Sequence, residues 1–236
     1  MENLKIIVLA AGKGTRMGSE AAHLPKVMRL ACGKPLLHYV LQAVSFAPKK
    51  DTVLVTGYLS DTVRAAFPDY PAVLQDPQLG TGHAVQCARG ELQGFTGTVL
   101  VCYGDMPLLR RETYEKMLAF HRDSGAACTL LAGTSTEPLP YGRVLTGPDG
   151  SFLRVVEDRD CTPEEKQIPL LNAGIYCFEA AYLLPALDEL QCENAQHEYY
   201  LTDVPALIQK AGGTTKVFSA ELNEQIVGVN TPEQLQ

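Results

Sequence analysis

Strand-sized apolar runs alternate with helix-like segments along the first half of the chain, and this alternation restricts the fold more than any other feature. The expected strands are residues 5–9, 52–56, 72–74, 98–102 and 127–131, and the expected helices are 35–46, 60–67, 83–90 and 111–123. The strands are rich in Val, Ile and Leu, as in strands buried on both faces. The order predicts right-handed crossovers, a parallel sheet between helical layers, and ligands at the carboxyl ends of the strands.

After residue 141 the pattern becomes richer in strands. Asp149-Gly150 separates apolar runs at 143–146 and 152–156, which is a hairpin signal. A longer run at 170–178, helices at 180–189 and 202–211, and a late strand at 215–218 follow. We therefore predict an α/β fold, a Rossmann-like three-layer sandwich whose mostly parallel sheet carries a small antiparallel lobe over its mouth.

The loop after the first strand is glycine-rich and basic, which is typical of a phosphate-binding turn. Gly12 and Gly14 can aim successive N–H groups at an anion, and Lys13 and Arg16 supply positive charge. The spacing excludes two common glycine loops. Met17 stands where a dinucleotide fingerprint has its third glycine, and no Gly-Lys-Ser/Thr run of the ATP-binding type occurs. The alternative is an ordinary strand-to-helix turn with solvated basic residues.

Polar residues also follow two later strands. Gln75 comes directly after the strand at 72–74 and Asp105 soon after 98–102, so both should meet the glycine loop at one edge of the sheet. Asp105 suits Mg²⁺, which proteins hold with one or two carboxylates, substrate phosphates and water. A helix-capping turn before Pro107 is an equally good alternative for this aspartate.

Composition narrows the function classes. The 236 residues are 46% hydrophobic, and no apolar run reaches the roughly 20 residues that span a bilayer. Without a cationic-then-apolar signal pattern we expect a cytoplasmic protein. The net charge of −7 argues against broad contact with nucleic acid or an anionic membrane. Seven scattered cysteines without a Cys-x-x-Cys pair indicate reduced thiols, and Cys102 and Cys177 should pack in the core.

The sequence gives no sign of hydrolytic machinery. Gly-x-Ser-x-Gly is absent, and the five histidines have neither a nucleophile partner nor metal-ligand spacing. His83 stands in a Gly-Thr-Gly-His loop, where it either approaches a ligand or simply begins a helix.

Motifs spread along the chain carry a resemblance to a known family. They are Leu9 to Met17, Leu24-Pro25-Lys26-Val27, Gln75 with residues 79–83, Tyr103-Gly104-Asp105, Tyr141-Gly142-Arg143, Val156-Glu157, Asn172-Ala173-Gly174, residues 198–203 and Gly228-Val229-Asn230. In this order they resemble the nucleotidyltransferases that make sugar nucleotides, in particular the UDP-N-acetylglucosamine pyrophosphorylases, which are uridylyltransferases. The resemblance covers nearly the whole chain and is more specific than any single motif.

The resemblance implies roles for individual residues. The nucleotide would meet Leu9, Ala10, Ala11 and Gly12, the uracil would be held by Gln75, Gly80 and Thr81, and the sugar pocket would be lined by Tyr103, Gly142, Glu157 and Asn172, with Gly104 as a further substrate contact. A Gln amide can accept from uracil N3–H and donate to O4, which agrees with this role. Arg16, Lys26 and Asp105 would be the catalytic residues, and Asp105 and Asn230 would hold Mg²⁺.

The implied reaction is transfer of a uridylyl group from UTP to N-acetylglucosamine-1-phosphate, with release of pyrophosphate. A phosphate monoester with a second pKa of about 6 is already mostly anionic at neutral pH, so no general base is required. Catalysis would rest on positioning and on charge neutralisation by Mg²⁺, Arg16 and Lys26. Residues 1–236 would form one nucleotidyltransferase domain, with a nucleotide-binding part at 1–135 and a sugar-binding part at 136–230. The partners are these two small molecules, and no oligomeric state is indicated.

The sequence departs from the family pattern in three ways, and the first two bear on sugar specificity. Nine residues separate Arg16 from Lys26, so residues 18–23 would form a bulge or a lid. His197 stands where a glycine usually precedes Glu-Tyr-Tyr, close to the expected sugar pocket. Bifunctional relatives continue into a β-helix of hexapeptide repeats that transfers acetyl groups, and because this sequence has no such repeat we expect no acetyl transfer.

Two alternatives remain open. The first is a related transferase that uses another sugar-1-phosphate, such as glucose-1-phosphate, or another nucleoside triphosphate. The second is a non-catalytic sugar-nucleotide-binding subunit on the same fold. Such a subunit would have no need to keep the phosphate cations and the metal ligands together, whereas Arg16, Lys26, Asp105 and Asn230 are all present.

Overall fold

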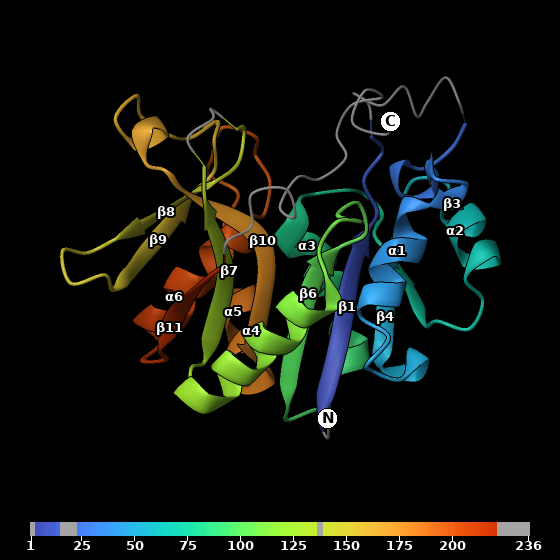
Figure 1. Ribbon diagram of the computed structural model, residues 1–236, viewed down its shortest axis with the longest axis horizontal. Coiled ribbons are helices and arrows are strands. Elements are labelled where there is room, and N and C mark those ends of the chain that lie inside the picture. Colours follow the sequence, from blue (N-terminus) through green and yellow to red (C-terminus); the bar gives the residue numbers. More distant parts are fainter. Residues whose placement is uncertain (1–2, 15–22, 136–138, 221–236) are drawn as a thin grey trace.

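The computed structural model describes residues 3–14, 23–135 and 139–220 (Figure 1). Its strands are β1 (Leu4–Ala10), β2 (Leu30–Ala31), β3 (Lys34–Pro35), β4 (Thr52–Thr56), β5 (Ala72–Leu74), β6 (Thr98–Tyr103), β7 (Cys128–Thr134), β8 (Arg143–Thr146), β9 (Phe152–Val156), β10 (Leu170–Glu179) and β11 (Thr215–Ser219). Its α-helices are α1 (Leu36–Ala43), α2 (Ser60–Ala66), α3 (Thr81–Cys87), α4 (Arg111–Ser124), α5 (Ala180–Asp188) and α6 (Val204–Lys210). Short 3-10 turns are η2 (Lys26–Met28), η3 (Lys49–Asp51), η4 (Arg89–Leu92), η5 (Glu165–Gln167) and η6 (Leu201–Asp203).

The main sheet has the strand order β11-β7-β10-β6-β1-β4-β5. Neighbouring strands run parallel except β10, which lies antiparallel between β6 and β7. The alternation of strands and helices predicted the parallel members. It did not predict that a strand from the second half of the chain would separate β6 from β7. The predicted α/β fold with a mostly parallel sheet is confirmed.

Helices cover both faces of this sheet (Figure 1). Alternate residues of β1 point to opposite faces, so Ile6 and Val8 join one hydrophobic cluster whereas Ile7 and Leu9 join the other. The first cluster includes residues of α1, α2 and α4, and the second includes residues of α3, α5 and α6. Each of these four β1 side chains is at most 7% exposed, which agrees with a strand that is apolar apart from Lys5.

The register of the parallel strands aligns their carboxyl ends. Leu9 of β1 pairs with Tyr103 of β6, Ala10 pairs with Thr56 of β4, and Thr56 in turn pairs with Leu74 of β5. The loops that begin after Ala10, Leu74 and Tyr103 therefore leave the sheet at one edge, as the sequence predicted.

The antiparallel part is a hairpin of β8 and β9 attached to β10, with Leu171 opposite Arg143 (Figure 1). Strand β10 changes register between Asn172 and Tyr176, and Gly174 within this bulge has φ of +77°. Such a conformation favours glycine, and bulges redirect side chains near functional sites. The hairpin and the bulge bring residues of the second half of the chain to the edge where the parallel strands end.

Some expectations differ from the structure in detail. Helix α3 begins at Thr81 rather than His83, and the Thr81 hydroxyl accepts a hydrogen bond from the Leu201 N–H at 3.0 Å. Cys102 and Cys177 are fully buried, which confirms their packing role, and burial raises the pKa of Cys102 to about 12. None of the helices in the described ranges could cross a bilayer. The motif Gly228-Val229-Asn230 and residues 18–22 of the expected bulge or lid lie outside the described residues.

Candidate active site

A cavity of about 450 Å³ opens where the carboxyl ends of β1, β5 and β6 meet. Its lining comes from the glycine loop, from the 75–81 loop with α3, and from the end of β6. The residues are Leu9, Ala10, Ala11, Gly12, Gly14, Lys26, Val27, Gln75, Gln78, Gly80, Thr81, Ala84, Tyr103, Asp105 and Glu198. Apart from Lys13, every described residue that the sequence assigned to the nucleotide or to the phosphates is among them. We refer to this space as the nucleotide cavity.

The glycine loop is held in place by the backbone of Gly104 and by the side chain of Gln78. The N–H of Gly104 donates to the carbonyl of Leu9 at 2.9 Å, and Nε2 of Gln78 donates to the carbonyl of Ala11 at 2.6 Å. A Cβ at Gly12 would meet no atom within 4 Å, so this glycine faces open space. The chain here presents backbone to the cavity, which suits a loop that binds an anion through N–H groups.

Gln75 and His83 form a polar pair at the floor of this cavity. The Gln75 side chain is only 4% exposed, and its Nε2 lies 2.8 Å from the Gly80 carbonyl and 3.2 Å from Nδ1 of His83. The other ring nitrogen of His83 lies 3.8 Å from the Cys87 sulfur. Burial lowers the pKa of His83, which favours the neutral ring. His83 therefore contacts a residue of the cavity instead of simply beginning a helix.

Lys26 and Asp105 are in direct contact. Lys26 Nζ donates to Asp105 Oδ2, and the two side chains are 12% and 22% exposed. The residues that the sequence assigned to phosphate and to metal thus lie side by side, although 79 positions separate them in the chain. Partial burial weakens solvent screening of both charges.

A second cavity of about 220 Å³ adjoins the first and shares Tyr103 and Asp105 with it. Its other lining residues are Met106, Pro140, Tyr141, Gly142, Glu157, Asn172, Ala173 and Gly174. The predicted sugar residues Tyr103, Gly142, Glu157 and Asn172 are therefore brought together here, and we refer to this space as the sugar-side cavity.

The polar groups of the sugar-side cavity are held by neighbours. Glu157 accepts a hydrogen bond from the Thr202 hydroxyl at 3.0 Å. Burial raises the pKa of Glu157, and the nearby carboxylates of Asp160, Asp203 and Glu198 raise it further, whereas the Thr202 hydrogen bond lowers it. Burial likewise raises the pKa of Tyr103 well above its ordinary value.

Asn172 organises the bulge of β10 beside this cavity. Its Nδ2 donates to the Tyr176 hydroxyl at 2.8 Å, and its Oδ1 accepts from the Gly174 N–H at 3.2 Å. A Cβ at Gly174 would lie 2.6 Å from Cε2 of Tyr103. The bulge therefore presses directly on the ring that both cavities share.

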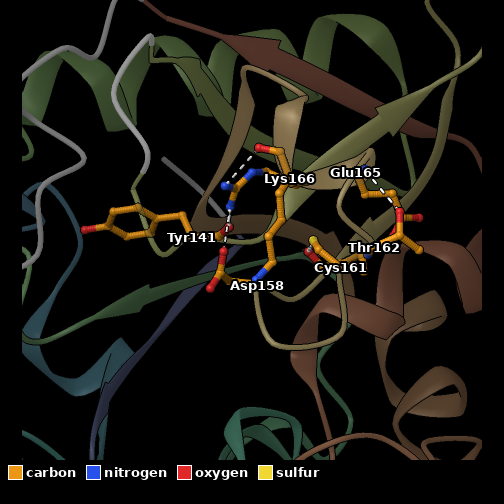
Figure 2. A network of polar contacts seen from close by, with 8 residues as sticks. Tyr141, Asp158, Cys161, Thr162, Glu165 and Lys166 are labelled. Atoms are coloured by element: carbon orange, nitrogen blue, oxygen red, sulfur yellow. Dashed lines mark hydrogen bonds and ion pairs between the residues drawn. The ribbon is translucent and has the colours of Figure 1, made fainter.

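A buried arginine joins the segments that frame the sugar-side cavity. Figure 2 labels three residues that it contacts, Tyr141, Asp158 and Lys166. Arg143 is 4% exposed, and its guanidinium donates to the Tyr141 carbonyl, to Asp158 Oδ1 at 3.2 Å and to the Lys166 carbonyl at 3.3 Å. Gly142 lies between Tyr141 and Arg143, and Glu157 precedes Asp158. The Arg143 side chain thus fixes the backbone next to Gly142 and Glu157, which both line the sugar-side cavity.

The loop between β9 and β10, which Arg143 contacts at Asp158 and Lys166, contains a short helical turn. Figure 2 shows Thr162 beside Glu165: the Thr162 N–H donates to Glu165 Oε2 at 2.9 Å, and the Glu165 N–H donates to the Thr162 hydroxyl at 3.2 Å. This reciprocal pairing is a capping box, which fixes the start of a helical turn. The Cys161 sulfur faces the Val156 carbonyl at 3.6 Å, so the loop is also tied to the end of β9.

Not every predicted site residue lines a cavity. Arg16 and Asn230 lie outside the described residues. Gly104 borders neither cavity; a Cβ there would meet Leu37 and Val27 at 3.1 Å, so its place is one of close packing. Conversely, several lining residues were not predicted from the sequence. They include Gln78, Glu198, Met106, Pro140 and Tyr141. Tyr141 and Glu198 belong to motifs already recognised, whereas Gln78 carries no signal beyond its place between Gln75 and Gly80.

His197 has a different setting from the one expected. Its φ is +54°, a left-handed conformation that favours glycine, in agreement with the glycine usual at this position. The next residue, Glu198, lines the nucleotide cavity rather than the sugar-side cavity. The Tyr199 N–H also donates to the Leu79 carbonyl at 2.8 Å, so this segment packs on the nucleotide loop.

The described residues contain no cluster of three or more His, Cys, Asp or Glu side chains suited to a metal. A Mg²⁺ ion needs only one or two carboxylates when phosphates and water complete its shell. Asp105 supplies one carboxylate where both cavities meet, so the donor chemistry suits a magnesium ion bound together with a phosphorylated ligand.

Comparisons with known proteins agree with this geometry. The model of the MobA-like NTP transferase domain matches residues 6–195. The chain is 45% identical to the bifunctional protein GlmU of Pelobacter propionicus over 238 residues, which cover 100% of this chain and 51% of that protein. It is 43% identical to GlmU of Geobacter metallireducens, covering 100% and 49%, and 41% identical to GlmU of Clostridium botulinum, covering 97% and 50%.

The chain spans about half the length of the relatives it matches. Within that span the similarity runs from end to end, and the family model alone covers far more than half of the chain. The resemblance inferred from the motifs is confirmed, and the chain belongs to the family of MobA-like NTP transferase domains.

Proposed function

We propose that this protein transfers a uridylyl group from UTP to N-acetylglucosamine-1-phosphate, forming UDP-N-acetylglucosamine and pyrophosphate. The observation that carries the proposal is that two cavities share Tyr103 and Asp105. One cavity offers a glycine loop and a lysine, which suit a triphosphate, and the other offers Glu157 and Asn172, which suit the hydroxyls of a sugar. Two substrates bound there would meet beside Asp105.

The choice of substrates rests on the motif resemblance and on the relatives. Proteins named GlmU match the chain over its whole length, and the motifs that resemble the uridylyltransferases supply most of the lining of both cavities. We propose accordingly that residues 1–135 bind the nucleotide and residues 136–230 bind the sugar.

The proposed chemistry is a direct displacement. An oxygen of the sugar-1-phosphate attacks the α-phosphorus of UTP in line, and pyrophosphate leaves. The attacking phosphate is mostly anionic at neutral pH because its second pKa is about 6, so no residue is needed to remove a proton. Lys26 and Arg16 hold the phosphates and offset their charge, and the cavity keeps the two substrates in contact.

Asp105 and Asn230 are the residues that would hold Mg²⁺. When bound, the ion would offset the negative charge of the phosphates. The arrangement supports this assignment through Asp105, whose carboxylate lies beside Lys26 in the wall common to both cavities.

The experiment is a matrix of pyrophosphate-release assays. UTP, CTP, ATP and GTP are each combined with N-acetylglucosamine-1-phosphate, glucose-1-phosphate or no acceptor, in the presence of Mg²⁺. We expect the highest kcat/KM for UTP with N-acetylglucosamine-1-phosphate. Preference for another pair would replace the substrates named here, and binding of UDP-sugars without turnover for any pair would indicate a non-catalytic subunit.

A further inference from the structure

The hydrogen bonds of Gln75 determine which way its amide faces. The Gly80 carbonyl can only accept, so the Gln75 atom 2.8 Å from it must be the NH₂ group. The second hydrogen of that NH₂ group points to Nδ1 of His83 at 3.2 Å. Nδ1 must then accept, which places the proton of the neutral imidazole on Nε2, toward the Cys87 sulfur at 3.8 Å.

With both amide hydrogens engaged, only the carbonyl oxygen of Gln75 is left for a ligand. Among residues 3–14, 23–135 and 139–220 no donor reaches this oxygen, although the Gln75 side chain is 96% buried and lines the nucleotide cavity. Gln75 is therefore an acceptor toward the cavity. This differs from the expectation that it would both accept from uracil N3–H and donate to O4.

The pyrimidine bases differ at the atom such an acceptor would face. Uracil carries a hydrogen on N3, whereas cytosine carries a lone pair there. An acceptor fixed in the cavity would attract the first and repel the second, and an unmatched buried polar group weakens binding strongly.

We propose that His83 is a positioning residue that sets base selection by fixing the carbonyl of Gln75 toward the base. This inference rests on the proposed uridylyl transfer. His83 itself does not touch the base in this assignment; it acts through Gln75, and its effect is on the choice between UTP and CTP rather than on the chemical step.

The test compares His83→Leu with His83→Asn. Leucine removes one of the two acceptors that hold the NH₂ group, so the amide of Gln75 is held by the Gly80 carbonyl alone and turns its NH₂ group to the base more readily. Asparagine places an oxygen near the position of Nδ1 and can keep the amide fixed. We expect the ratio of kcat/KM for UTP over CTP to fall about tenfold in H83L, chiefly through KM, which is the effect of one neutral hydrogen bond. In H83N the ratio should stay within about threefold of wild type.

Ribothymidine triphosphate serves as the internal control because its base keeps the N3–H. The UTP to ribothymidine triphosphate ratio should not move in either variant, whereas a general loss of structure would lower all three activities together. If H83L does not fold, His83→Gln is used in its place. The glutamine amide would reach toward Cys87, so no acceptor would remain at the position of His83 Nδ1. An unchanged UTP to CTP ratio in H83L or H83Q overturns the role of His83. A wild-type protein that uses neither nucleotide overturns the proposed function instead.

Discussion

The two cavities are built in different ways although they share a wall. The nucleotide cavity is formed largely by loops that leave parallel strands at one edge, and the carbonyls of Leu9, Ala11 and Gly80 hold its parts together. The sugar-side cavity joins a hairpin, a bulge and a long loop through side chains, above all Arg143 and Asn172. The first depends on strand register, and the second on a few buried polar side chains.

This difference has a practical consequence. A cavity made from backbone keeps its shape when a surrounding side chain changes, but it fails when a Cβ invades it. A cavity held by a buried polar network fails when one member is removed, because the remaining partners lose their hydrogen bonds. Substitutions in the two cavities should therefore differ in kind and in size.

Substitution of Asp105, in the wall common to both cavities, should lower activity most. We expect Asp105→Asn to lower kcat at least ~100-fold, because the carboxylate would hold the Mg²⁺ ion that offsets the phosphate charge where both substrates meet. Steady-state pyrophosphate release measures the loss, and thermal unfolding checks that the variant folds. The matched control is Asp69→Asn, since Asp69 also pairs with a lysine, Lys49 at 2.7 Å, but at the surface. Activity of D105N within tenfold of wild type would exclude a role for this carboxylate in turnover.

Arg143, in the polar network beside the sugar-side cavity, should give the next effect in size. Arg143→Met leaves Asp158 and two carbonyls without their partner, and we expect a loss of about 3 kcal/mol in the free energy of unfolding. The KM for the sugar phosphate should rise more than the KM for UTP. Arg154→Met is the control, because its pair with Glu165 involves a 59% exposed arginine and should change stability by less than about 1 kcal/mol. Equal stability of the two variants would mean that the network does not hold the lobe.

Gly80 beside the nucleotide cavity and Gly174 beside the sugar-side cavity allow the same substitution to be compared in both. A Cβ at Gly80 (φ +109°) would lie 2.6 Å from the Tyr199 carbonyl, and one at Gly174 (φ +77°) would lie 2.6 Å from the Tyr103 ring. Each alanine variant should lose about 1–3 kcal/mol of stability. We expect G80A to raise chiefly the KM for UTP, and G174A chiefly the KM for the sugar phosphate. In G94A, with φ of +72° and no atom within 4 Å of the Cβ, neither KM should change.

If G80A and G174A raised the same KM, the two cavities would not divide the substrates between them. Initial-rate measurements with one substrate varied and the other saturating give both constants.

Glu157 should produce the smallest effect on stability, and this effect should depend on pH. Because burial raises its pKa, the folded protein binds a proton more tightly than the unfolded chain, so this group destabilises the fold as pH rises through the shifted pKa. Glu157→Gln should therefore be more stable than wild type at pH 8, with the advantage disappearing toward pH 4. Denaturant unfolding at the two pH values measures it. An advantage that grew at low pH would contradict the direction of the shift.

The sequence predicted the nucleotide cavity better than the sugar-side cavity, for a physical reason. Ends of parallel strands meet at one edge, so Gln75 and Asp105 could be placed from the order of strands alone. The insertion of β10 between β6 and β7 depends on pairing between segments far apart in the chain, which local periodicity does not encode. The role of Arg143 depends on the same pairing, and its motif gave no indication of which carbonyls it would reach.

The orientation of the Gln75 amide could not be predicted from the sequence either. The residue type permits an acceptor and a donor to face a base, and only the positions of Gly80 and His83 show that the donors are already engaged. The left-handed backbone of His197 was likewise not predicted, although it agrees with the glycine usual at this position.

The central claim is that two substrates react directly with each other across the wall at Asp105, without a covalent intermediate on the protein. The stereochemistry at the α-phosphorus tests it most directly. The protein would be supplied with one diastereomer of UTP carrying sulfur on the α-phosphorus, together with N-acetylglucosamine-1-phosphate, and the configuration of the product would be read by ³¹P NMR. A single in-line displacement predicts inversion. Retention would require two displacements through a nucleotidylated side chain, and it would contradict the direct reaction.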